Sequence, residues 1–123
     1  MKTGAGRIKG RAFERDTIKQ LRDLGFEAND TFGSGSGEEK GDVLFEKYMV
    51  ECKFHRELSD KQVDAFWVKL TKEAEDAELS PLLLFKTNNH RPVVMYWDEC
   101  TKSLSRRMAY WDEWLDDNKP EDD

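Results

Sequence analysis

Apolar residues recur at helical spacing in three segments of the chain. In the first, about Ile8 to Leu24, Phe13, Ile18, Leu21 and Leu24 recur at helical spacing, and Gly25 follows as a typical residue at a helix C-terminus. The second, about Ser59 to Glu78, opens with a Ser-Asp-Lys-Gln capping box. The third runs roughly from Lys102 to Leu115. These segments predict three amphipathic helices.

Five shorter apolar segments predict strands. The second and third of them flank Glu46-Lys47-Tyr48 and predict a hairpin. The order helix, three strands, helix, two strands, helix predicts an α/β fold: a central mixed five-stranded sheet flanked by helices, with an extra C-terminal helix. The predicted strands are Phe26 to Asn29, Asp42 to Phe45, Met49 to Phe54, Leu82 to Phe85 and Val93 to Trp97.

The length of 123 residues predicts one domain. No segment is long and apolar enough to span a membrane, so we expect a cytoplasmic protein with no membrane partner. Cys52 and Cys100 lack metal-ligand spacing and are expected to be plain thiols. The domain is expected to consist of a mobile arm (1–7), a core (8–97), a C-terminal helical extension (98–116) and an acidic tail (117–123).

The formal net charge of −6 is unevenly distributed. Residues 112–123 contain seven acidic residues and one lysine, a local charge of −6, whereas residues 1–22 contain seven basic and two acidic residues, a local charge of +5. A basic front and an acidic tail allow nucleic-acid binding at the N-terminal end. The simpler interpretation, solvated charge at both ends, is weakened because the basic residues lie on the first predicted helix.

The segment from Gly41 to Lys53 is the strongest candidate for chemistry. Side chains alternate along an extended strand, so Glu51 and Lys53 would point to one face and Cys52 to the other. In the predicted hairpin Asp42 lies on the neighbouring strand, where it could share a site with Glu51. Two carboxylates beside a lysine can hold a divalent cation and activate a water molecule.

Other polar features keep a structural and a functional interpretation. Glu14 borders the buried stripe of the first helix, either as the partner of an arginine or as part of a polar site. The glycine-serine segment from Thr31 to Lys40 either wraps a phosphate or is a flexible connector. Gln62 has a sound structural function in the capping box. His55 and His90 fit no metal or triad arrangement and are expected at the surface.

Four pieces of the sequence, taken in order, match one family. They are Gly10-Arg11-Ala12-Phe13-Glu14-Arg15, Gly35-Ser36-Gly37 before Lys40-Gly41-Asp42, Glu51-Cys52-Lys53 and Leu58-Ser59-Asp60-Lys61-Gln62-Val63. With them the chain resembles the archaeal and phage type of Holliday junction resolvase, in the PD-(D/E)xK (restriction endonuclease-like) nuclease superfamily. The resemblance covers about Lys9 to Trp97, the expected nuclease core. It departs from the family at Ala28-Asn29-Asp30, where relatives commonly carry an arginine.

The resemblance implies a metal-dependent DNA endonuclease that resolves four-way junctions by paired symmetric nicks, with water attacking the phosphodiester. It implies Mg²⁺, with Mn²⁺ expected to substitute, held by Asp42, Glu51 and the backbone carbonyl of Cys52. Glu14 would act through a water or a second ion, and Lys53 would orient or deprotonate the attacking water. Further implied site residues are Ser36 and Gln62 at the catalytic centre and Lys9, Arg11, Arg15, Ser34, Lys40 and Arg56 on DNA.

Two symmetric nicks imply a homodimer, whose interface we expect near Trp97, Met108 and Trp111. Two alternatives remain open at this stage. One is another PD-(D/E)xK nuclease that acts on flaps, forks or specific duplex sites. The other is a noncatalytic junction-binding module, which the presence of every expected metal ligand argues against.

Overall fold

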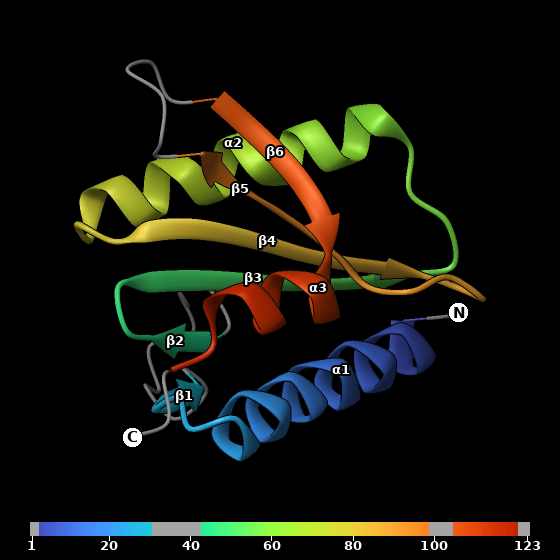
Figure 1. Cartoon of the computed structure of the whole chain (residues 1–123). Helices are drawn as coiled ribbons and strands as arrows, with labels where there is room; N and C mark the ends of the chain where they lie inside the picture. Colours follow the sequence, from blue (N-terminus) through green and yellow to red (C-terminus); the bar gives the residue numbers. More distant parts are fainter. Residues whose placement is uncertain (1–2, 31–42, 99–104, 121–123) are drawn as a thin grey trace.

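A computed structural model of the chain describes residues 3–30, 43–98 and 105–120, with side chains for residues 11–29 of the first range. Within these ranges the elements are α1 (Thr3–Asp23), β1 (Ala28–Asp30), β2 (Val43–Phe45), β3 (Tyr48–His55), α2 (Asp60–Asp76), β4 (Ser80–Thr87), β5 (Val93–Asp98), β6 (Ser105–Tyr110) and α3 (Trp111–Asn118), as Figure 1 shows.

The six described strands form one sheet in the order in which they occur along the chain. All neighbouring pairs are antiparallel except β3 and β4, which are parallel. A parallel pair needs a crossover connection, and α2 supplies it. β3 and β4 pair along eight residues, from Tyr48↔Ser80 to His55↔Thr87, and form the centre of the sheet.

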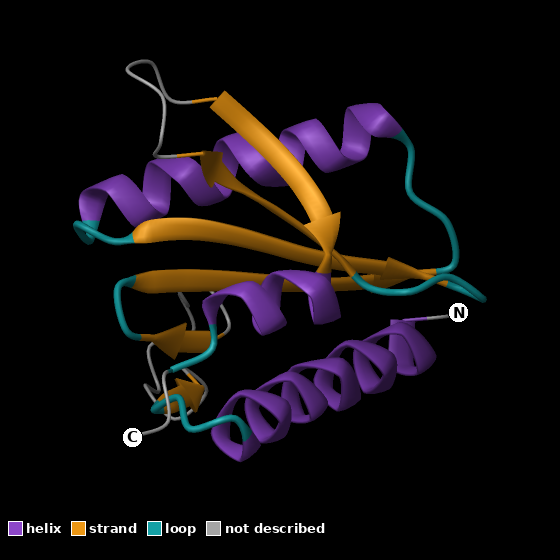
Figure 2. Ribbon diagram, in the orientation of Figure 1, coloured by secondary structure: helices purple, strands orange, loops and turns teal. Residues whose placement is uncertain are grey.

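Helices cover both faces of the sheet. α2 lies on one face, and α1 and α3 lie on the other (Figure 1, Figure 2). Residues of β3 alternate between the two cores, with Val50 packed on the α1 and α3 side and Met49 on the α2 side. The odd-numbered residues of β3 therefore face α2. On the other face, Trp111 Nε1 of α3 donates a hydrogen bond to Gln20 Oε1 of α1 at 2.9 Å and joins these two helices.

The predicted α/β class, the first two helices and the five predicted strands are confirmed. α1 ends as predicted, because Gly25 adopts a φ of 101°, in the left-handed region that favours glycine. Phe26 N donates to Leu21 O and Gly25 N to Arg22 O, both at 3.0 Å, which is the Schellman pattern of a helix end. In the described part of the chain, no helix combines the length and the apolar character that crossing a membrane requires.

The predicted C-terminal helix is wrong in its first half. Residues 105–110 form β6, and α3 begins at Trp111, so the sheet has six strands where five were predicted. β6 pairs with β5 along six residues, from Val93↔Tyr110 to Asp98↔Ser105. Pairing with a sheet edge thus overrides the local helical spacing of residues 104–115. The segment predicted as a helical extension contains a strand followed by a shorter helix.

The predicted mobile arm is also wrong from Thr3 onward. α1 begins at Thr3, five residues before the expected start at Ile8. No proline interrupts this stretch, and its two glycines, Gly4 and Gly6, lie within the first turns of the helix. The helix is therefore longer than its apolar periodicity indicated, because a polar first turn carries no periodic signal.

Candidate active site

Glu51 and Lys53 lie side by side on β3, as the alternation of the strand predicted. Lys53 Nζ is 3.2 Å from Glu51 Oε2, and the side chains are 29% and 20% exposed, respectively. Both face the α2 side of the sheet, whereas the Cys52 thiol points to the α1 side and donates to Thr17 Oγ1 at 4.0 Å. The strand thus presents a carboxylate and an ammonium together, with access to solvent.

The edge of β3 that carries this pair is open within the described residues. β4 pairs with all eight residues of β3, whereas β2 pairs only with Tyr48 to Val50. The β2 pairing stops at Val43↔Val50, one residue before Glu51, and Asp42 precedes Val43 in the chain. Asp42 itself lies outside the described residues, so its position beside Glu51 stays a prediction.

α2 contributes an aromatic ring to the site. The Phe66 ring centroid is 4.7 Å from Lys53 Nζ, a cation–π distance. The same ring stacks with the imidazole of His55, at 5.8 Å between centroids and 25° between planes. Partial burial, and next the nearby Lys53 ammonium, lower the pKa of His55 below its ordinary value of 6.5. His55 is exposed, as expected, and it also lies two positions from Lys53 on the same strand face.

Gln62 lies at the start of α2 and is held by the helix cap. Its Oε1 accepts hydrogen bonds from Ser59 N at 2.9 Å and Ser59 Oγ at 3.2 Å, so the predicted capping box is confirmed. The α2 side chain that contacts the Lys53 ammonium is Phe66, one turn later. The structural interpretation of Gln62 is therefore observed directly, and its implied action on Lys53 stays a prediction.

Glu14 comes from α1, on the opposite face of the sheet from α2. Its side chain is half-buried, as expected at the border of the buried stripe. Next to it, Phe13 contacts Phe54 edge to face at 5.7 Å between ring centroids, so this turn of α1 lies against β3 just after Lys53. β3 therefore lies between α1 and the sheet face that carries Lys53, and the participation of Glu14 in the site stays a prediction.

Exposed basic residues form a row along α1. Arg11 and Arg15, implied to bind DNA, are exposed, and so are Lys19 and Arg22. Their spacing of four, four and three positions places all of them on one side of the helix. Lys9 lies in α1 but its side chain is not described, Arg56 is exposed after β3, and Ser34, Ser36 and Lys40 lie outside the described residues. Lys19 and Arg22 contribute to the positive charge of residues 1–22 but were not among the residues implied to bind DNA.

The implied donors suit a hard divalent cation. Among the described residues, no three His, Cys, Asp or Glu side chains gather at a metal-binding distance, and that set does not include Asp42. Two carboxylates and the backbone carbonyl of Cys52 are oxygen ligands, the kind that Mg²⁺ prefers. Glu51 supplies one of these carboxylates at a partly exposed position. The residues present therefore fit the ion by their donor chemistry.

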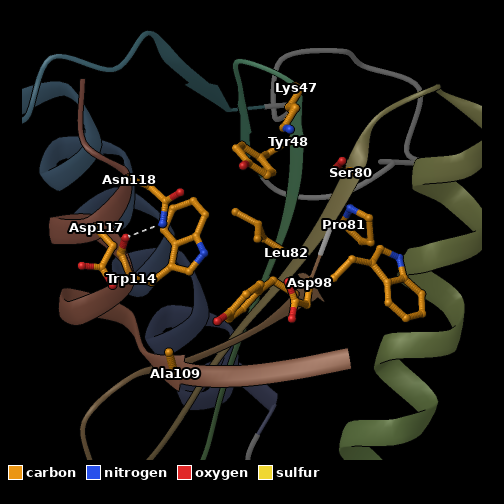
Figure 3. Close-up of a pocket in the computed structure, with 12 residues that line it drawn as sticks. Lys47, Tyr48, Ser80, Pro81, Leu82, Asp98, Ala109, Trp114, Asp117 and Asn118 are labelled. Atoms are coloured by element: carbon orange, nitrogen blue, oxygen red, sulfur yellow. Dashed lines mark hydrogen bonds between the residues drawn. The ribbon is translucent and has the colours of Figure 1, made fainter. Parts of the chain in front are cut away.

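A separate cavity lies on the other face of the sheet. It has a volume of about 290 Å³ and opens between the start of β3 and the end of α3. Figure 3 shows Tyr48 and Leu82 on the sheet side and Trp114 and Asn118 on the α3 side. Of the residues of β3, only Tyr48 at its start lines this cavity, so the cavity does not include the Glu51–Lys53 pair.

Comparison with known protein families shows which family the chain belongs to. The family described as "Phage putative PDDEXK endonuclease" matches residues 5–119. The chain belongs to this family. The match confirms the resemblance to PD-(D/E)xK nucleases, and it extends through β6 and α3, which the sequence analysis had placed outside the family core. No curated protein matches the chain by sequence.

Among solved structures, the chain is similar to a Holliday junction resolvase from the archaeal hyperthermophile Archaeoglobus fulgidus. The TM-score is 0.50, 19% of the residues are identical, and the match covers 82% of this chain and 86% of that chain. At this identity the likeness establishes the fold. The fold of the chain is therefore the one predicted from the resemblance, with one additional strand.

Proposed function

We propose that the protein is a metal-dependent endonuclease that resolves four-way DNA junctions by paired symmetric nicks. The observation that carries the proposal is the Glu51–Lys53 pair at the open edge of β3, in a chain that belongs to a PDDEXK endonuclease family. The spacing Glu51-Cys52-Lys53 is the carboxylate-x-lysine part of the pattern that gives the family its name.

Each proposed catalytic group has a distinct task. Asp42, Glu51 and the Cys52 carbonyl would hold Mg²⁺, and Mn²⁺ is expected to substitute. When bound, such an ion polarises the phosphodiester and a coordinated water. Lys53 donates hydrogen bonds that orient the attacking water and stabilise the charge that develops on the phosphate. Glu14 completes the site from α1, around the open edge of β3.

DNA binding is supported by the basic row on α1. Arg11, Arg15, Lys19 and Arg22 are exposed on one side of the helix, and α1 packs against the strand that carries the proposed site. Guanidinium and ammonium groups in such a row neutralise successive backbone phosphates and position a duplex without reading its sequence. The remaining DNA contacts that we propose are Lys9, Ser34, Lys40 and Arg56, whereas Ser36 is proposed at the catalytic centre.

Junction DNA is proposed as the substrate because the fold is that of a protein described as a Holliday junction resolvase. Symmetric nicks need two active sites, which a homodimer with a twofold axis provides. The interface that we expected must be revised, since Trp111 is buried at 2% exposure, whereas Met108 is 61% exposed. Met108 pairs with Met95 of the α2-side core, so it faces the α2 side of the sheet edge.

The test is cleavage of a substrate panel. The protein is incubated with a synthetic four-way junction, a flap, a fork and a linear duplex of matched sequence, each in Mg²⁺ or in EDTA. We expect symmetric nicks in the junction, no cleavage in EDTA and little cleavage of the linear duplex. Preferential cleavage of flaps or forks would assign a different branched substrate, equal cleavage of linear duplex would refute junction selectivity, and junction binding without any cleavage would indicate a noncatalytic module.

A further inference from the structure

Phe66 differs from the buried apolar residues of α2. The buried stripe of the helix is formed by Val63, Trp67, Leu70 and Ala74, whereas Phe66 is only partly buried at the border of that stripe. Its ring contacts the Lys53 ammonium and stacks on His55, both of which extend from the site face of β3. This ring therefore belongs to the surroundings of Lys53 as much as to the core.

Two interactions define the position of the Lys53 ammonium. Glu51 Oε2 lies 3.2 Å away, and the Phe66 ring centroid lies 4.7 Å away on α2. The negative face of an aromatic ring attracts an ammonium group. A lysine side chain has many rotamers in water, so a ring that attracts its ammonium reduces the number of rotamers that remain populated.

We infer that Phe66 is a positioning residue that holds the Lys53 ammonium at the open edge of β3, ready for the attacking water and the phosphate. The inference rests on the proposed nuclease function of Lys53. Phe66 touches neither DNA nor metal in this assignment and acts through Lys53 alone. A proposed catalytic step that depends on hydrogen bonds from Lys53 gains when the ammonium is already in place, because positioning of the donor is part of the barrier.

The contact predicts that position 66 requires an aromatic ring. Leucine at position 66 would keep an apolar side chain at the border of the α2 core, but it has no negative face for the ammonium. Tyrosine keeps the ring, and the partial exposure of Phe66 gives its hydroxyl group access to water. The pair Phe66→Leu and Phe66→Tyr therefore separates the ring from simple apolar packing.

The first test measures cleavage and binding separately. Single-turnover cleavage of a saturating four-way junction in Mg²⁺ is compared among wild type, Phe66→Leu and Phe66→Tyr, and junction affinity is measured with Ca²⁺ in place of Mg²⁺. The cation–π strength corresponds to a loss of about three- to thirtyfold in cleavage rate for Phe66→Leu, with an unchanged Kd. Phe66→Tyr should cleave at close to the wild-type rate.

The second test does not depend on cleavage. In the free protein, the ε-methylene protons of Lys53 should show an upfield NMR shift from the ring current of Phe66, with the resonance assigned by its loss in Lys53→Arg. We expect the shift to persist in Phe66→Tyr and to disappear in Phe66→Leu.

The outcomes distinguish the two levels of the account. If wild type cleaves no DNA but the ring-current shift is present, the proposed function fails and the contact between Phe66 and Lys53 stands. If wild type cleaves and Phe66→Leu cleaves equally fast, the positioning role is refuted. Equal losses in Phe66→Leu and Phe66→Tyr would also refute it, because they would show that the position tolerates no substitution for packing reasons.

Discussion

At the residue scale, the site depends on a lysine that is held on two sides. Glu51 attracts the Lys53 ammonium along the strand, and Phe66 approaches it from the helix above. His55 stacks on the same ring. Partial burial, and next the repulsion of a second positive charge by Lys53, lower the pKa of His55 and favour the neutral form.

The lowered pKa of His55 predicts a pH dependence of stability. Burial, followed by Lys53, lowers this pKa in the folded protein below 6.5, so the unfolded chain takes up the proton more readily. The stabilising contribution is complete above pH 6.5 and is lost as the pH falls through the lowered folded value. His55→Gln should therefore lose less thermal stability than wild type between pH 7.5 and pH 5, in melting curves recorded at matched ionic strength.

A matched variant controls for general acid effects. His90→Gln removes the other histidine of the chain, for which the structure provides no comparable contact with Lys53 and Phe66. It should follow the wild-type decrease. If His55→Gln and wild type lose stability in parallel, the electrostatic account of His55 is incorrect.

The pair Glu51 and Lys53 could be predicted from sequence because strand alternation is a local property with a period of two. Phe66 and His55 could not be assigned to the site in that way. Phe66 appeared in the apolar stripe of a helix, and only the packing of α2 on β3 shows that its ring faces Lys53. One feature of the sequence pointed to Phe66: it lies four positions after Gln62, on the same face of the helix as a residue already implied at the catalytic centre.

At the element scale, α2 couples the cap, the core and the site. Ser59 and Gln62 cap the helix, its buried stripe anchors it on the sheet, and Phe66 reaches Lys53. The helix also connects the parallel strands β3 and β4, which pair with each other at the centre of the sheet. A loose N-terminus of α2 would therefore disturb both stability and the surroundings of Lys53.

Variants at Gln62 separate its two assigned functions. Gln62→Ala removes the acceptor for Ser59 N and should destabilise the protein by about 1 kcal/mol in urea unfolding. Gln62→Glu keeps a capping-box acceptor and should retain wild-type stability. If Gln62 is structural, junction cleavage by Gln62→Glu also stays at the wild-type level. Lost cleavage at unchanged stability would instead show that the amide acts at the catalytic centre.

The C-terminal elements show where local patterns mislead. Met108, Trp111 and Leu115 have helical spacing, yet Met108 belongs to β6 and the other two to α3. The outer edge of β5 offers backbone donors and acceptors to a neighbouring strand, and this long-range pairing has no signature in the sequence of β6 itself. The capping box and Gly25 were predictable because they act within a few residues.

At the scale of the whole molecule, the uneven charge and the exposed sheet edge agree with a protein that binds DNA as a dimer. The basic row lies on α1, and acidic residues dominate the chain from Asp112 onward. The sheet ends at β6, where Met108 is 61% exposed on the strand. An exposed apolar residue on an edge strand can pack against a second copy of the chain, and we propose this contact for the dimer.

The dimer can be tested by mass in solution. Two chains of 14.4 kDa should sediment as one species of twice that mass at micromolar concentration. Met108→Glu should shift the protein towards the single-chain mass, because it places a charge in the expected contact. Leu24→Glu is a control at another exposed apolar residue, 37% exposed just after α1 on the other face of the sheet, and should leave the mass unchanged. A single-chain mass for wild type would refute the homodimer.

The central claim is that the open edge of β3 is the catalytic centre of a metal-dependent nuclease. The most direct measurement is single-turnover cleavage of a saturating four-way junction by Glu51→Gln and Lys53→Ala, with Glu75→Gln on the exposed surface of α2 as control. The account predicts losses of about a hundredfold or more for the first two, with junction affinity in Ca²⁺ retained, and wild-type cleavage for the control. Cleavage by Glu51→Gln at the wild-type rate would contradict it.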